Sequence, residues 1–161
     1  MKTLYRNIIT TFAIIALVNI FTGCKEAADE FSHPNNLISN MRIMGTIGAD
    51  GIAGEIFEYN AAGELVPSDQ VTIEAVKGGY GRIVFELDPA SNIDPERCYL
   101  SASLTFSEII TPGLSGLKNI TNRNDEGVAQ GMEITVTSGI GTTRRYTVIG
   151  YYTGEYILNN Q

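Results

Sequence analysis

The chain has 161 residues, with 18 acidic side chains against 11 basic ones and a formal net charge of −7. This acidic balance argues against nucleic acid as a partner and against docking onto anionic lipid through a basic patch. Seventeen glycines, the absence of tryptophan and abundant Val, Ile, Thr and Tyr favour short strands joined by tight turns. The composition therefore predicts a small β-rich protein.

The beginning of the chain has the layout of a secretory signal. Lys2 and Arg6 are basic, and the stretch from Ile8 to Phe21 is apolar apart from two threonines and one asparagine. A run of this length fits the apolar region of a signal peptide and falls short of the roughly 20 residues that a membrane-spanning helix needs. We therefore expect residues 1–23 to be a signal peptide.

The run ends in Phe21-Thr22-Gly23-Cys24, which resembles the bacterial lipobox, with Phe21 where that motif usually has Leu. The resemblance implies recognition by lipoprotein-processing enzymes, cleavage between Gly23 and Cys24, and attachment of acyl chains such as palmitate to Cys24. Each buried CH₂ contributes about 0.8 kcal/mol, so two or three chains hold a protein at a membrane. The alternative is an uncleaved N-terminal anchor with an incidental cysteine.

The residues after Cys24 indicate a destination. Lys25-Glu26-Ala27-Ala28-Asp29-Glu30 resembles the export signal of surface lipoproteins in the Bacteroidota, and no Asp follows the cysteine as an inner-membrane retention cue. The resemblance implies lipid anchoring in the outer membrane with the protein facing the cell exterior, although a periplasmic orientation stays open. The same residues also suit a charged, solvated tether.

Without residues 1–23, 138 residues remain and the net charge becomes −9, because the removed segment holds two basic residues and no acidic one. This length suffices for one domain with its own core. Residues 24–36 are polar and are expected to form the flexible tether, which includes His33, the only histidine. Cys98 is expected to be a small buried apolar residue, since the other cysteine carries lipid.

Alternating apolar residues predict the strands of a domain at 37–152. The period of two is clearest from Cys98 to Phe106. The segment Lys77–Gly81 is expected to join Val71–Val76 and Arg82–Leu87 as a hairpin. The expected strands are 38–47, 55–59, 64–66, 71–76, 82–87, 98–106, 132–137 and 144–150, with 107–124 as an irregular crossover and 153–161 as a C-terminal extension.

About seven strands without an amphipathic helix predict an all-β fold, and we expect an immunoglobulin-like β-sandwich with Greek-key connections. The stretch Ile134–Val148, with Ile140-Gly141 in place of the usual Asp-Gly turn, is similar to the last hairpin of immunoglobulin-like domains in Bacteroidota surface lipoproteins. Residues 104–120 resemble the segment that precedes that hairpin. Such domains are often modules of glycan-capture or adhesion proteins, which is what the resemblance implies for this chain.

Motifs of known chemistry are absent from the sequence. It has no nucleophile elbow, phosphate loop or metal-protease motif, so we expect no enzyme, no cofactor and no metal centre. Gly78-Gly79-Tyr80-Gly81 is glycine-rich but joins two expected strands. The loop Asp88–Glu96 offers oxygen ligands for calcium without the spacing of an EF-hand, so a solvated loop is expected and calcium binding stays open.

Tyrosines are the candidates for ligand contact, because aromatic rings stack on sugars. Tyr151, Tyr152 and Tyr156 cluster near the C-terminus, and Tyr80 lies in the glycine-rich segment. The alternative is half-buried packing with the hydroxyl at the rim of the domain.

The sequence leaves three functional hypotheses. The first is a non-enzymatic surface lipoprotein acting as a small binding or accessory module, with glycan capture as one role. The second is a structural or adhesion subunit that pairs strands with a larger envelope protein complex. The third is an enzyme or its inhibitor, and no residue pattern supports it.

Overall fold

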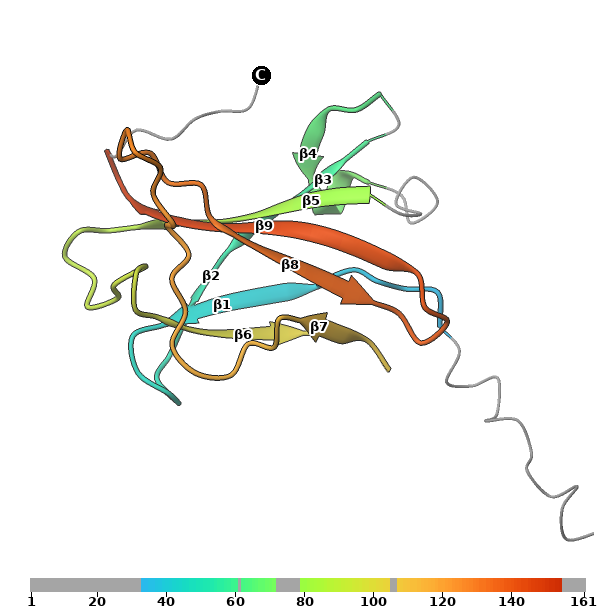
Figure 1. The fold of residues 1–161 in the computed structure, drawn as a ribbon, viewed down its shortest axis with the longest axis horizontal. Helices are drawn as coiled ribbons and strands as arrows, with labels where there is room; N and C mark the ends of the chain where they lie inside the picture. Colours follow the sequence, from blue (N-terminus) through green and yellow to red (C-terminus); the bar gives the residue numbers. More distant parts are fainter. Residues whose placement is uncertain (1–32, 61, 72–78, 105–106, 155–161) are drawn as a thin grey trace, which may run out of the picture. The chain divides into compact units, whose positions relative to one another are not determined.

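The computed structural model describes residues 33–60, 62–71, 79–104 and 107–154 (Figure 1). Within these ranges the regular structure is β apart from a short 3₁₀ helix, η2 (Ser68–Gln70). None of the described residues form a helix that is both long and apolar enough to cross a membrane. The strands are β1 (Asn40–Met44), β2 (Ile52–Ala53), β3 (Glu55–Tyr59), β4 (Leu65–Pro67), β5 (Gly79–Leu87), β6 (Tyr99–Ser103), β7 (Ile109–Thr111), β8 (Met132–Thr137) and β9 (Thr143–Tyr152).

The strands form two sheets, which confirms the all-β prediction. The larger sheet has the order β4-β3-β5-β9-β8-β7, and the smaller one has the order β2-β1-β6 (Figure 1). All pairs are antiparallel except β5 with β9, which run parallel from Gly79 opposite Arg144 to Leu87 opposite Tyr152. These two strands are the longest in the described part of the chain and form the middle of the larger sheet.

One hydrophobic core lies between the sheets. The smaller sheet contributes Met41 and Ile43, and the larger sheet contributes Phe85, Val136 and Val148, all of them at most 1% exposed. Alternate residues of β1, β5 and β8 are buried, as the period of two requires. Each fully buried side chain of this size stabilises the fold by about 1.5–3 kcal/mol relative to an exposed one.

The chain passes from one sheet to the other at Gly54. Strand β2 pairs with β1 in the smaller sheet, and β3 pairs with β5 in the larger one. Gly54 is the single residue between β2 and β3. The Gly54 amide donates a hydrogen bond to the Met41 carbonyl (2.9 Å), which keeps the crossing close to β1. A Cβ atom at Gly54 would lie 2.8 Å from Cε1 of Phe85. Glycine is therefore required here by the close approach of the Phe85 ring.

The connections divide the β domain into two ends. The long segments 45–51, 88–98 and 112–131 gather at one end, which we call the loop end, where Ile120 accepts from Gly150 (3.0 Å) and donates to Pro95 (2.9 Å). The opposite end, the turn end, holds the hairpin turn 138–142, and residues 33–39 enter the domain there (Figure 1). The Thr142 hydroxyl donates to the Pro34 carbonyl (3.1 Å), which places the entering chain beside that turn.

Several expected strands are confirmed. Strand β3 matches 55–59, strand β5 contains 82–87 with Ile83, Phe85 and Leu87 buried, and β8 with β9 forms the expected terminal hairpin. In the hairpin turn Gly141 has φ of +83°. The Ser138 hydroxyl accepts from the Thr142 amide (3.1 Å). This serine closes the turn without the aspartate of the related pattern.

Other expectations at the level of elements are wrong. Both edges of β5 are occupied over Gly81–Val84, by β3 and β9, where a hairpin partner was expected; residues 72–76 of that expected partner lie outside the described residues. Gly79–Gly81 belongs to β5 rather than to a turn. Ile47, the last residue of the expected strand 38–47, lies in a turn and is 72% exposed. The crossover after β6 contains an additional strand, β7.

Cys98 lies in the core. Its side chain is fully buried, and its thiol faces the carbonyls of Pro95 and Lys118 at 3.8 and 3.5 Å. Burial raises the pKa of this thiol to about 11. Since the thiolate is the reactive form of cysteine, Cys98 is a packing residue.

Alanine at position 54 tests the crossing between the sheets. The added methyl group would overlap the Phe85 ring, so Gly54→Ala should lower the free energy of unfolding by about 1–3 kcal/mol. Gly113→Ala is the matched control, because a Cβ there meets no atom within 4 Å. Chemical denaturation followed by circular dichroism measures both variants. Equal stability of the two would contradict the proposed constraint.

Candidate functional site

A buried ion pair lies between β3 and β9 near the turn end. Oε2 of Glu58 accepts from Arg144 Nε at 2.9 Å and lies 2.5 Å from Arg144 Nη2. The two side chains are 2% and 1% exposed. Strand β5 lies between β3 and β9 in the sheet, so the two charged side chains reach toward each other across it.

Tyr146 completes this cluster. Its hydroxyl donates to Oε1 of Glu58 (2.6 Å) and accepts a hydrogen bond from the Ile38 amide (3.3 Å). The guanidinium carbon of Arg144 lies 5.8 Å from the centroid of the Tyr146 ring, within the range of a cation–π contact. Both carboxylate oxygens of Glu58 therefore have donors, as a buried charge requires.

Two glycines in β5 make room for the cluster. A Cβ atom at Gly81 would lie 2.5 Å from the Tyr146 ring and 2.9 Å from Oε2 of Glu58, and one at Gly79 would lie 3.4 Å from Arg144 Nη1. Glycine inside a strand usually weakens it, and a close approach by other groups is the usual reason for its presence. The glycine-rich segment is thus explained by packing in a sheet, not by a turn.

Burial dominates the titration of the cluster. Removal from water raises the pKa of Glu58, against the hydrogen bond from Tyr146 and the positive charge of Arg144. The pKa of Tyr146 is also raised, by burial and then by the Glu58 carboxylate. These groups satisfy one another inside the core. The arrangement therefore holds the strands together and presents no reactive group to a solvent-borne substrate.

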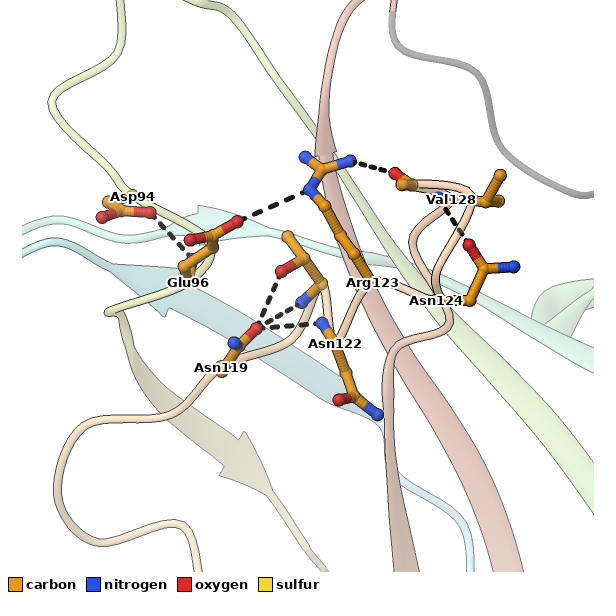
Figure 2. Close-up of polar contacts among 9 residues, drawn as sticks. Asp94, Glu96, Asn119, Asn122, Arg123, Asn124 and Val128 are labelled. Atoms are coloured by element: carbon orange, nitrogen blue, oxygen red, sulfur yellow. Dashed lines mark hydrogen bonds and ion pairs between the residues drawn. The ribbon is translucent and has the colours of Figure 1, made fainter.

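One group of exposed polar side chains with defined hydrogen bonds lies at the loop end, and Figure 2 shows its contacts. Oδ1 of Asn119 accepts from the Thr121 amide (3.0 Å), the Thr121 hydroxyl (2.8 Å) and the Asn122 amide (3.0 Å). Oδ1 of Asn124 likewise accepts from Glu126 (3.1 Å) and Val128 (2.8 Å). Such asparagine turns fix the loop backbone locally.

Charged side chains join this loop to its neighbour at the same end. Arg123 donates from Nη1 to the Gly127 carbonyl (2.9 Å), and its Nε lies 3.5 Å from Oε1 of Glu96 (Figure 2). The Asp94 carboxylate accepts from the Glu96 amide (2.8 Å). Loops held in this way lose little conformational freedom when a partner binds. The loop end is therefore the candidate contact surface.

Of the candidate tyrosines that the structure describes, Tyr80 lies apart from Tyr151 and Tyr152. Tyr80 is 56% exposed at the start of β5, where Arg145 lies over its ring at 5.6 Å. Tyr151 and Tyr152 are half-buried at the other end of the parallel strands, about 20 Å away at 3.3 Å per residue. The Tyr152 hydroxyl donates to the Ile93 carbonyl (3.1 Å), and burial raises the pKa of Tyr151. Tyr156 lies outside the described residues.

The remaining candidate residues do not form a binding site in the described part of the chain. Gly23 and Cys24 lie outside it. In the calcium candidate, the Asp88 carboxylate accepts from the Ala90 amide (2.8 Å), as Asp94 does from Glu96. Among the described residues no group of three His, Cys, Asp or Glu side chains is placed to hold a metal ion.

The comparisons with known proteins identify no relative: no family model, curated protein or solved structure matches this chain. The site is therefore interpreted from its own geometry.

The sequence analysis did not single out Glu58, Arg144 or Tyr146. Glu58 follows Ile56 at a spacing of two, which places it on the inward face of β3 with an apolar neighbour. The alternation of Gly79 and Gly81 in an otherwise regular strand is a second signal, since both glycines contact the cluster. Neither signal identifies the partner, because 86 residues separate Glu58 from Arg144.

A double-mutant cycle tests the ion pair. Glu58→Gln and Arg144→Met should each cost about 3–5 kcal/mol of stability, because each leaves a buried partner uncompensated. The double variant should cost less than the sum of the two. Denaturant unfolding gives all four free energies.

The neighbouring exposed pair provides the control. Arg145 and Glu133 are 3.6 Å apart with side chains 53% and 60% exposed, so the cycle through Glu133→Gln and Arg145→Met should give a coupling below about 1 kcal/mol. A coupling between Glu58 and Arg144 no larger than this would argue against the buried pair.

Proposed function

We propose that the chain is a lipid-anchored protein of the outer membrane, facing the cell exterior, and that its immunoglobulin-like β-sandwich is a non-enzymatic binding or accessory module. The support for the anchor is the order of Lys2 and Arg6, the apolar run Ile8–Phe21 and Thr22-Gly23-Cys24. In a protein of this type the acyl chains on Cys24 attach the chain to the membrane and the folded part works outside it.

The observation that supports the binding role is that the chain enters the β domain at the end opposite to the loop end. The chain enters at the turn end, where Pro34 contacts Thr142. The ten residues of β9 separate that end from the loop end by about 30 Å at 3.3 Å per residue. An anchor attached through residue 33 therefore leaves the loop end free to meet a partner. The partner is a glycan or an envelope protein complex.

The polar character of the loop end favours recognition through hydrogen bonds. Side chains of Asn119, Asn124 and Arg123 fix the loops by their own contacts, and Figure 2 draws no contact to the amide nitrogen of Asn119 or Asn124. Rigid loops with donors and acceptors suit hydroxyl-rich or peptide ligands.

A second candidate function is strand pairing with a larger envelope complex. Strand β7 is at the edge of the six-stranded sheet, and Ile109 within it is 63% exposed. An edge strand offers backbone groups to an added strand.

Metabolic labelling tests the anchor. Labelled palmitate should enter the wild-type protein and should be lost from Cys24→Ala, because the acyl chains attach to that sulfur. Cys98→Ala is the matched control and should keep the label, since Cys98 is buried in the core. Equal labelling of the wild type and Cys24→Ala would contradict the proposed anchor.

Site-specific photo-crosslinking on living cells tests the binding role. A crosslinking residue at Asn122, on the loop end, should give a discrete adduct with a glycan or envelope protein. The same residue at Ile140, which is 50% exposed in the hairpin turn, is the control and should give none. An adduct at Ile109 alone would favour strand pairing instead. Adducts of equal yield at Asn122 and Ile140 would contradict a binding role for the loop end.

A further inference from the structure

The segment that leads into the first strand is fixed to both sheets, although it was expected to include the end of a flexible tether. Residues 34–39 form no strand, yet Asn36 and Ile38 are 5% and 3% exposed. The Ser39 amide donates to the Ser103 carbonyl in the smaller sheet (3.2 Å). The Ile38 amide donates to the Tyr146 hydroxyl in the larger one (3.3 Å).

The buried ion pair prepares Tyr146 to hold this segment. The Tyr146 proton is directed to Oε1 of Glu58 at 2.6 Å. Because the hydroxyl proton is used in this bond, the lone pairs of the hydroxyl oxygen face the Ile38 amide, and the tyrosine acts as an acceptor there. Arg144 fixes the carboxylate through its other oxygen. The orientation of the contact to Ile38 thus depends on three side chains from β3 and β9.

The contacts of the segment differ from those of the strands. Among the contacts of residues 34–39 with the sheets, the Pro34 carbonyl accepts from Thr142, the Ile38 amide donates to Tyr146, and Ser39 donates from its amide and hydroxyl to the Ser103 carbonyl. The side chains of Asn36 and Ile38 are buried. Strand β9, by contrast, pairs along its length with β5 and over six residues with β8. Segments with few contacts open at lower free energy than the sheets to which they attach.

We propose that residues 34–39 are a releasable strap, latched by the Tyr146 hydroxyl, that sets how far the β domain stands from its anchor. When the strap is latched, the rigid body begins at Pro34. Released, the six residues add up to about 20 Å of reach at 3.3–3.6 Å per residue. The biological sense of the strap rests on the proposed anchor, but the opening itself does not.

Hydrogen exchange on the purified full chain in detergent tests the strap, whether or not Cys24 carries acyl groups, so its failure is separate from failure of the anchor. In the wild type the Ile38 amide should exchange faster than the Val148 amide in β9. Tyr146→Phe removes the bond to Glu58 as well as the one from the Ile38 amide; the loss at Ile38 should accelerate exchange of that amide relative to Val148 by about tenfold.

Tyr152→Phe is the matched control, because it removes a tyrosine hydroxyl bond on the same strand, to the Ile93 carbonyl at the other end. It should leave the ratio of the two exchange rates unchanged. Thr142→Val should accelerate exchange of the amides of residues 35–37 while sparing β9, even where Tyr146→Phe fails to fold. Equal exchange rates of Ile38 and Val148 in all variants would overturn the proposal, since the segment would then open only with the whole domain.

Discussion

The pairing of Glu58 with Arg144 is the constraint on which the middle of the larger sheet depends. Two charges that are at most 2% exposed are stable in a core only if they face each other and if their remaining hydrogen-bonding groups are satisfied. The carboxylate meets this condition by dividing its oxygens between Arg144 and Tyr146. The register of β3, β5 and β9 must therefore place these three side chains next to one another.

The same constraint explains why β5 begins with glycines. Arg144 and Tyr146 alternate along β9 on the inward face, directly beside Gly79 and Gly81 in the parallel pair. Side chains at those two positions would occupy the space that the guanidinium and the phenol ring need. Because successive residues of a strand point to opposite faces, a slip of β9 by one residue would turn Arg144 and Tyr146 outward and Arg145 inward. The cluster thus specifies register as well as stability.

The local sequence pattern was sufficient to predict much of the fold, but it was not sufficient to predict the cluster of Glu58, Arg144 and Tyr146. Alternation located Ile83, Phe85 and Leu87 on one face of β5, and the glycine-containing turn joined β8 to β9, because both depend on neighbours in sequence. The parallel pairing of β5 with β9 joins residues about 65 positions apart, which no local pattern encodes. The ion pair depends on that pairing, so it could not be predicted either. Tyr151 and Tyr152 are adjacent in sequence, but the register of the parallel pair sets Tyr80 opposite Arg145, at the other end of β9.

The direction of β9 connects the core to the proposed function. Its first residues include Tyr146, which accepts a hydrogen bond from Ile38 in the entering segment, and its last residues contact the long loops through Gly150 and Ile120. One strand therefore joins the end where the chain arrives to the end with the fixed polar loops. A hydrophobic core alone would stabilise either end without relating them. The buried charges make the arriving segment part of the rigid body, and this rigidity allows a tether at one end to orient a contact surface at the other.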